Sequence, residues 1–123
     1  MVEELILKLI QIQTQWRFLH WQTFGDAKHK TYGAIYEGLD GLIDEFVETM
    51  MGKYGRPSFE SEFAVMFQDI SSLSIQKFTD GVTEFLVSMS DKLDGRYDTD
   101  LLNLRDEMLG LINKSKYLLT LKY

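Results

Sequence analysis

Apolar residues recur at steps of three and four through nearly the whole chain, and this spacing is typical of amphipathic α-helices. Proline, which breaks helix interiors, occurs once in the 123 residues, as Pro57. A chain with helical spacing throughout and a single proline has little sequence that favours strands. The sequence therefore predicts an all-α protein.

Four long helices are expected, each with one apolar stripe. They cover about residues 3–22, 31–51, 74–93 and 99–121, and Thr31 is the expected cap of the second helix. A longer connection, residues 53–73, lies between the second and third helices. Ser58 is a reasonable N-cap within it, and the apolar spacing after Ser58 predicts a short helix carried by Phe59, Phe63, Met66, Phe67 and Ile70.

The lengths of the connections indicate how these helices are arranged. Short connections at Gly25 and at Asp94-Gly95 make each flanking pair of helices antiparallel. The connection of residues 53–73 is long enough to cross the bundle. Two long helices, a crossover with its own short helix and two more long helices are typical of the ferritin-like four-helix bundle. We expect a single such domain that spans residues 1–123.

Composition limits the classes of function. The chain contains no cysteine, which excludes a disulfide framework, a thiolate metal site and a cysteine nucleophile. Its formal net charge of −6 disfavours binding to nucleic acid. No apolar run approaches the ~20 residues that span a bilayer, and Met1 leads directly into an amphipathic segment. We expect a cytoplasmic protein without a membrane partner.

The chain contains a small set of side chains that iron and zinc prefer as ligands. His20 lies near the end of the first helix, and His29 lies near the start of the second. Asp44 and Glu48 lie one turn apart on the second helix, in an acidic stripe that begins at Asp40. Taken singly, each of these residues fits an ordinary solvated surface.

Helix geometry separates the candidate ligands within one chain. With a turn near residue 26, Asp44 lies about 18 Å beyond the level of His20, at ~1.5 Å per residue. A histidine nitrogen binds a metal at about 2.1 Å, so one metal cannot reach both groups. His20 and His29, in contrast, differ by only about 4.5 Å of rise. We therefore expect a histidine end and a carboxylate end, which a twofold axis between subunits would join into two mixed sites.

The first helical hairpin combines a His-Trp pair, a glycine turn, a second histidine and an Asp-x-x-x-Glu pair, in the order His20-Trp21, Gly25, His29 and Asp44/Glu48. This combination resembles the Dps-like mini-ferritins, in which the same residues follow in the same order and bind iron between twofold-related subunits. One position departs from that family, because Gly33 stands where an acidic residue is expected.

The resemblance implies a role for each residue. His20 would bind iron from one subunit, and Asp44 and Glu48 would bind it from the partner. His29 would hold a second iron or a water, and Trp21 would lie beside the site. The implied protein is a homo-oligomer, a hollow shell in this family, with intersubunit mono-iron or di-iron sites that zinc can occupy as a substitute. The implied activity is that of a ferroxidase, which oxidises Fe(II) with peroxide or dioxygen and stores or detoxifies the iron.

Two further interpretations stay open. The eight Phe, six Tyr and two Trp also suit a metal-free helical bundle that acts as a structural or interaction module. The stripe of Asp40, Asp44 and Glu48 suits a Mg²⁺-dependent hydrolase if a carboxylate such as Glu84 or Glu107 faces it.

A di-iron centre inside one bundle is disfavoured. Such a centre needs a Glu-x-x-His motif on two helices. The positions three residues before the two histidines hold Arg17 and Asp26, and the third and fourth helices contain no histidine.

Overall fold

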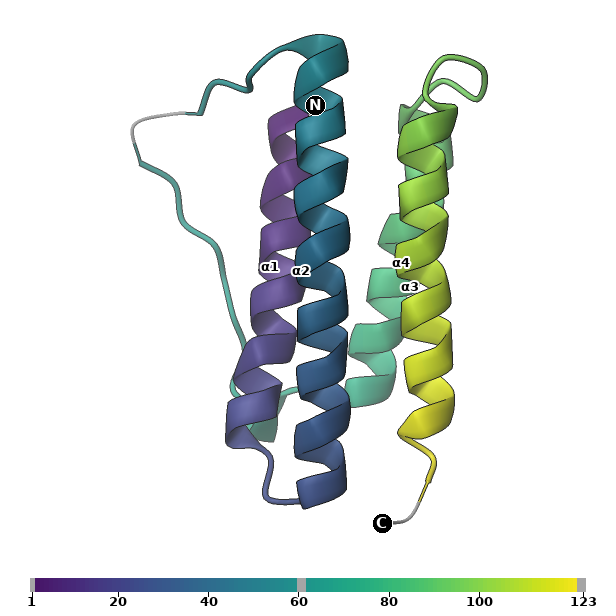
Figure 1. Cartoon of the computed structure of the whole chain (residues 1–123). Coiled ribbons are helices and arrows are strands. Elements are labelled where there is room, and N and C mark those ends of the chain that lie inside the picture. The colour runs from purple at the N-terminus through teal and green to yellow at the C-terminus, as the bar shows by residue number, and fades with distance from the viewer. Residues whose placement is uncertain (1, 60–61, 122–123) are drawn as a thin grey trace.

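Four α-helices form the bulk of the computed structural model, which describes residues 2–59 and 62–121 (Figure 1). They are α1 (Val2–Gln22), α2 (Asp26–Tyr54), α3 (Ile75–Lys92) and α4 (Thr99–Leu118). A three-residue 3-10 helix, η1 (Ile70–Ser72), precedes α3, and no strand occurs in the described ranges. The prediction of an all-α four-helix bundle is confirmed.

The helices are arranged as two antiparallel hairpins. Residues 23–25 join α1 to α2, and residues 93–98 join α3 to α4. The described parts of the connection, residues 55–59 and 62–74, lie on the α1 side and end at the opposite end of the bundle, so α2 and α3 point in the same direction (Figure 1). Because α2 packs against both α1 and α4, the two hairpins meet mainly through α2 and α4.

One apolar core joins all four helices. Its largest fully buried side chains are Trp16 from α1 and Tyr32 and Phe46 from α2. They pack with buried aliphatic and methionine side chains of every helix, including Leu9, Leu39, Val82, Leu86, Met89, Leu101, Met108 and Ile112. These residues belong to the stripes that the sequence spacing indicates, because positions three and four apart lie on one helix face. In the described part of the chain, no helix is both long enough and apolar enough to cross a membrane.

Helix α2 begins five residues before the expected cap. Gly25, with extended backbone, precedes it, and the His29 amide donates to the Gly25 carbonyl at 2.8 Å. Thr31 lies inside the helix, where its hydroxyl donates to the Ala27 carbonyl one turn back at 3.0 Å. Thr31 is therefore not an N-cap, and the turn between α1 and α2 contains only three residues.

The short helix expected after Ser58 is not present in the described residues of the connection. Its backbone is irregular from residue 62 to residue 69, and positions 60 and 61 lie outside the described ranges. Four of the apolar residues that suggested a helix are exposed, Met66 to 81%, whereas Ile70 is partly buried against the core and Phe67 contacts Phe18. A short amphipathic helix needs a surface on which to bury its whole apolar face, and polar contacts of the backbone hold much of this connection instead.

Those polar contacts come from glutamines of α1 that we call the glutamine stripe: Gln11, Gln15 and Gln22. The Gln15 amide donates to the Gln68 carbonyl at 2.9 Å and accepts from the Gln68 amide at 2.9 Å. Gln11 donates to the Met66 carbonyl at 2.8 Å. Gln22 accepts from the Ile70 amide at 2.9 Å. The glutamine stripe thus supplies hydrogen-bond partners that a helix would otherwise supply to the crossover backbone.

Candidate metal site at the first helical hairpin

The two histidines of the chain lie against each other where α1 turns into α2. His20 lies near the end of α1 and His29 in the first turns of α2. Their rings are stacked, with centroids 3.8 Å apart and planes inclined by 20°. The structure therefore confirms the prediction that His20 and His29 lie at the same end of the bundle.

Each histidine also hydrogen-bonds to the backbone of the other. Nδ1 of His20 lies 2.7 Å from the carbonyl oxygen of His29, and Nδ1 of His29 lies 2.7 Å from the carbonyl oxygen of His20. A carbonyl oxygen only accepts hydrogen bonds, so the hydrogen belongs on Nδ1 in both rings. In the neutral form of this tautomer, both Nε2 atoms carry a lone pair.

The hairpin accommodates this pair because residue 33 is a glycine. A Cβ atom added to Gly33 would lie 2.9 Å from both Cε1 and Nδ1 of His20. Real Cβ atoms essentially never approach that closely, so the imidazole occupies the space that any larger residue would need. Gly33 thus replaces the expected acidic residue for a steric reason.

The histidine pair also has a purely structural role. The His20 carbonyl is one of the last four of α1, which have no partner within their helix. The His29 ring supplies the missing donor at 2.7 Å. The pair therefore closes the end of α1 and fixes the angle at which α2 leaves the three-residue turn.

Aromatic side chains flank the histidines on α1. The exposed Trp21 ring lies 5.9 Å from the Phe18 ring. The Arg17 guanidinium lies between two rings, 5.0 Å from the centroid of Trp21 and 4.9 Å from that of Tyr36. Cation–π contacts of this kind hold Trp21 along the α1–α2 surface.

The carboxylates of the candidate site do not meet the histidines. Asp44 and Glu48 are exposed on α2, and neither forms a hydrogen bond or ion pair with another described residue. Asp40 accepts a hydrogen bond from Gln13 at 2.7 Å. Among residues 2–59 and 62–121, no three histidine, aspartate or glutamate side chains form a group that could hold a metal ion. One chain therefore completes neither the mixed site nor a Mg²⁺ site built on Asp40.

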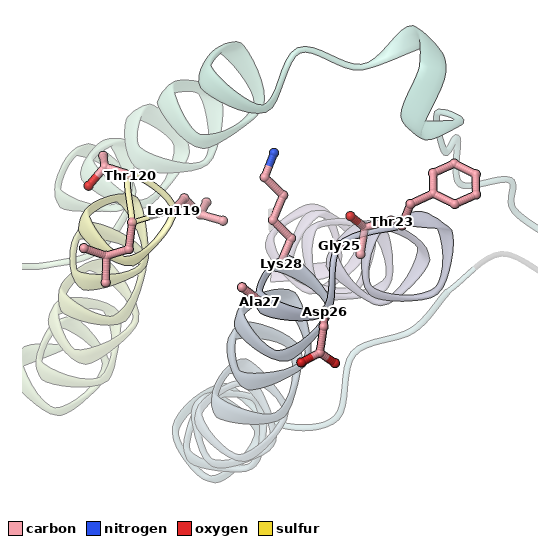
Figure 2. A pocket seen from close by; sticks show the side chains of 9 residues that line it. Thr23, Gly25, Asp26, Ala27, Lys28, Leu119 and Thr120 are labelled. Atoms are coloured by element: carbon pink, nitrogen blue, oxygen red, sulfur yellow. The ribbon is translucent and has the colours of Figure 1, made fainter. Parts of the chain in front are cut away.

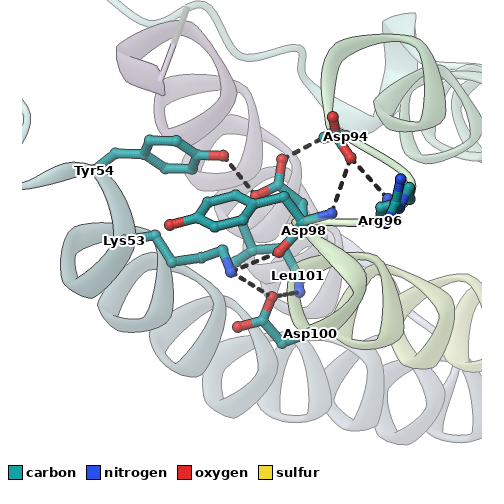
Figure 3. A network of polar contacts seen from close by, with 8 residues as sticks. Lys53, Tyr54, Asp94, Arg96, Asp98, Asp100 and Leu101 are labelled. Carbon is teal, nitrogen blue, oxygen red and sulfur yellow. Dashed lines mark hydrogen bonds and ion pairs between the residues drawn. The ribbon is translucent and has the colours of Figure 1, made fainter.

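A second polar cluster, which the sequence analysis missed, closes the opposite end of the bundle (Figure 3). Asp98, only 2% exposed, accepts a hydrogen bond from the Tyr54 hydroxyl at 2.5 Å and one from the Asp94 amide at 2.8 Å. The Asp94 carboxylate in turn accepts from the amides of Arg96 and Tyr97. The Asp-Gly turn was visible in the sequence, but its contact with Tyr54 crosses between helix pairs and has no local signal.

The same cluster ties α2 to the start of α4. Lys53 donates to the Tyr97 carbonyl at 2.8 Å and forms an ion pair with Asp100 at 3.1 Å. These contacts lower the pKa of Asp100, first through the hydrogen bond from Lys53. The hydrogen bond to Asp98 raises the pKa of Tyr54 to about 12. Every polar group described here has a partner inside the protein, so the cluster acts as a structural lock.

The fold and the hairpin define a small helical bundle whose first turn is closed by a stacked histidine pair. The chain belongs to a family of unknown function, DUF5856, whose model matches residues 20–119. It is 27% identical over 120 residues to an uncharacterized 14.6 kDa protein in the mobD-ri intergenic region of Enterobacteria phage T4. That alignment covers 98% of this chain and 88% of the phage protein. No solved structure matches the chain significantly.

These comparisons overturn the resemblance to the Dps-like mini-ferritins, which finds no support in the family or in the phage relative. The residues that suggested it have local explanations. His20 and His29 close the hairpin, and Gly33 makes room for the His20 ring. A His-Trp pair followed by a second histidine is therefore not specific for that family.

Proposed function

We propose that this protein binds a first-row divalent metal ion, with iron as the native metal and zinc as a substitute, at a site shared between two copies. Nε2 of His20 would be the ligand from one copy, and Asp44 and Glu48 would be the ligands from the other. Because the His29 ring is stacked on that of His20, its Nε2 would hold a second metal ion or a water. The observation that carries the proposal is the fixed Nδ1–H of both rings on backbone carbonyls. Metal-binding histidines almost always donate their second ring N–H to such an acceptor.

The availability of the carboxylates supports the second half of the proposal. Asp44 and Glu48 are exposed one turn apart on α2 and have no partner in the described part of their own chain. A twofold axis would bring them to the histidine end of another copy and would make two identical sites. One imidazole alone leaves a metal ion under-coordinated, which is why a second copy is part of the proposal.

The ligand types suggest the chemistry. Carboxylate oxygens favour Fe(III), whereas imidazole nitrogens retain affinity for Fe(II). A mixed site therefore suits the oxidation of Fe(II), with dioxygen or peroxide as the electron acceptor, and the retention of the ferric product. As part of this proposal, we infer that the bundle has the ferritin-like arrangement of helices, because a single long crossover joins the two parallel helices α2 and α3.

A metal-free interaction module is the second candidate. The observation that favours it is the exposure of large aromatic side chains in the described residues, among them Trp21, Phe24, Phe63 and Tyr117. Exposed aromatic residues are enriched at protein–protein contacts. This candidate predicts a partner surface but no metal-dependent change.

The test needs variants that remove ligands and keep the hairpin closed. In His29→Asn and His20→Asn, the side-chain amide nitrogen is as many bonds from Cα as Nδ1, so it keeps the donor and lacks Nε2. Asp44→Asn and Glu48→Gln change exposed groups without described partners. The matched control is Glu45→Gln, an exposed carboxylate one position from Asp44.

Anaerobic titration with Fe(II) and with Zn(II) gives the affinity, and sedimentation gives the number of 14.4 kDa subunits. We expect each ligand variant to weaken metal binding by more than about tenfold, as loss of even an indirect partner does, while Glu45→Gln matches wild type. Aerobic Fe(II) oxidation should be faster than in buffer. A monomer that binds no metal, or histidine variants with wild-type affinity, would contradict the proposal.

A further inference from the structure

Three adjoining pockets open at the hairpin end of the bundle, away from the histidine pair. All three lie between the start of α2 and the end of α4 and are lined by Lys28 and Leu119. One of them also reaches the start of α3. Figure 2 shows the widest of them, about 900 Å³, with Lys28 and Leu119 on its two sides. The pocket of interest, about 450 Å³, extends inward to Tyr32 and Thr79.

Tyr32 brings an unused hydrogen-bond donor to this pocket. Its side chain is 2% exposed, and its ring packs against Trp16 with centroids 5.9 Å apart. The hydroxyl forms no hydrogen bond with any described residue, yet it is not among the fully buried unpaired atoms, so it faces the pocket. Burial raises the pKa of Tyr32, which keeps the phenol protonated as a donor. A donor in so buried a side chain is costly unless something accepts its hydrogen bond.

Lys28 brings a positive charge without a counter-ion in the described residues. In Figure 2, its side chain extends into the space between the hairpin and α4, whereas Asp26 points away. The other cations at this end are engaged: Lys30 pairs with Asp26 at 3.1 Å, and Lys116 donates to the Thr83 hydroxyl at 3.0 Å. Lys28 is thus the cation at the pocket that lacks a partner.

Lys28 and Tyr32 lie four residues apart on α2, so their side chains project from the same face, one turn apart. Both line the 450 Å³ pocket. Ile75 and Leu119 form an apolar wall of this pocket, and its other lining residues are polar: Gln76, Thr79, Asp80, Lys116 and Thr120. Lys116 and Asp80 form an ion pair at 3.7 Å, so their charges offset each other. One unpaired positive charge, one hydroxyl donor and an apolar wall together match a ligand with one negative group and a hydrocarbon body.

We propose that this pocket binds a medium-chain monocarboxylate, with the carboxylate between Lys28 and the Tyr32 hydroxyl and the hydrocarbon chain against Ile75 and Leu119. An anion such as inorganic phosphate fits less well, because it would leave the apolar wall uncovered. The inference is independent of the metal proposal, since neither histidine lines the pocket.

Sodium octanoate, used below its micellar range and with EDTA present, is the probe. Trp16 packs against Tyr32 and reports binding by its fluorescence in a Trp21→Phe background, which removes the second indole. We expect a saturable change with octanoate. The neutral n-octanol should bind at least about tenfold more weakly, since it lacks the charge that Lys28 recognises.

Variants assign the two polar contacts. Lys28→Met should weaken octanoate binding about tenfold, the usual effect of a charged hydrogen bond, and Tyr32→Phe should weaken it by a smaller factor. Lys114→Met, an exposed lysine on α4 that does not line the pocket, is the matched control and should bind as the background protein does. Tyr32→Phe should also melt at the same temperature, because its hydroxyl has no partner in the described protein.

Several results would overturn the proposal. They include the absence of saturable octanoate binding, equal affinity for octanol, equal effects of Lys28→Met and Lys114→Met, and a lower melting temperature for Tyr32→Phe without ligand. The last result would mean that the protein already uses the hydroxyl. Equal binding of inorganic phosphate would likewise show that the pocket selects charge alone.

Discussion

His20 lies directly on Gly33, with no room between the imidazole and the α2 backbone for a methyl group. A Cβ at Gly33 would come within 2.9 Å of two ring atoms, and the ring is held in place by its hydrogen bond to His29. The glycine on α2 and the histidine on α1 are therefore one unit, and a change at either residue disturbs the hairpin.

Replacement of Gly33 by alanine tests this relationship. The added methyl group must displace the His20 ring, and overpacking of this kind costs about 1–3 kcal/mol. Gly41→Ala is the control, because nothing lies within 4 Å of a Cβ built at Gly41 in the same helix. Both variants gain helix propensity, so Gly33→Ala should be less stable than Gly41→Ala by about 1–3 kcal/mol in urea unfolding. Equal stabilities would show that the ring moves aside freely.

The glutamine stripe makes a prediction about the crossover. Gln15 is 4% exposed, and both ends of its amide pair with the Gln68 backbone. Gln15→Ala removes the partners of those two backbone groups. Because Gln68 is exposed and water can replace the lost amide, we expect a cost of about 0.5–1.5 kcal/mol, the net value of an ordinary hydrogen bond. Proteolysis between residues 62 and 69 should become faster than in wild type. Gln13→Ala, which removes a contact to Asp40 on α2 instead, should leave that rate unchanged.

Alkaline pH should weaken the lock at the other end of the bundle. The hydrogen bond to Asp98 raises the pKa of Tyr54 to about 12, above the value of about 10 for an unfolded tyrosine. The folded state thus holds the phenol proton more tightly, so this contribution to stability is complete below pH 10 and disappears between pH 10 and pH 12. Between pH 8 and pH 11, the free energy of unfolding in urea should fall less for Tyr54→Phe than for wild type. For Tyr117→Phe, at an exposed tyrosine of α4, it should fall as much as for wild type.

Acidic pH should weaken the contacts that Asp69 makes in the connection between α2 and α3. Hydrogen bonds from Ser71, followed by one from Gln22, lower the pKa of Asp69. An aspartate with a lowered folded pKa stabilises the protein above the unfolded value and loses that effect as the pH falls through the folded value. The protection of the Ser71 amide, taken as its exchange rate relative to the intrinsic rate at the same pH, should therefore fall below about pH 4 in wild type. In Asp69→Asn this protection should already be low at neutral pH and should not fall further in acid, whereas Asp91→Asn on α3 should behave as wild type.

Helix periodicity predicted α1, α3 and α4 to within a few residues, because their apolar stripes coincide with the core. It placed the start of α2 too late, since Thr31 has the residue type of a cap but bonds within the helix. It also predicted a helix through Phe63 and Met66, where spacing alone does not reveal whether a surface exists to bury them. The side-chain amides that hold this segment lie more than fifty positions away along the chain.

The candidate site was likewise predictable only in part. The helical rise per residue predicted that His20 and His29 lie at the same end of the bundle, because both lie beside a short turn. The stacking of the rings depends on Gly33, and a glycine in a helix carries no local signal of what packs on it. Whether Asp44 and Glu48 join the histidines depends on a second copy, and the role of all four as metal ligands stays a prediction.

The long connection of residues 55–74 has a consequence for the electrostatics of the bundle. By returning the chain to the hairpin end before α3 begins, it places the starts of α2 and α3 beside the finishes of α1 and α4 (Figure 1). Each end of the molecule thus has two positive and two negative helix poles, whose fields largely cancel. Any preference of the hairpin end for an anion must therefore come from side chains. A single lysine on α2, Lys28, can thus determine whether an anion or a cation binds there.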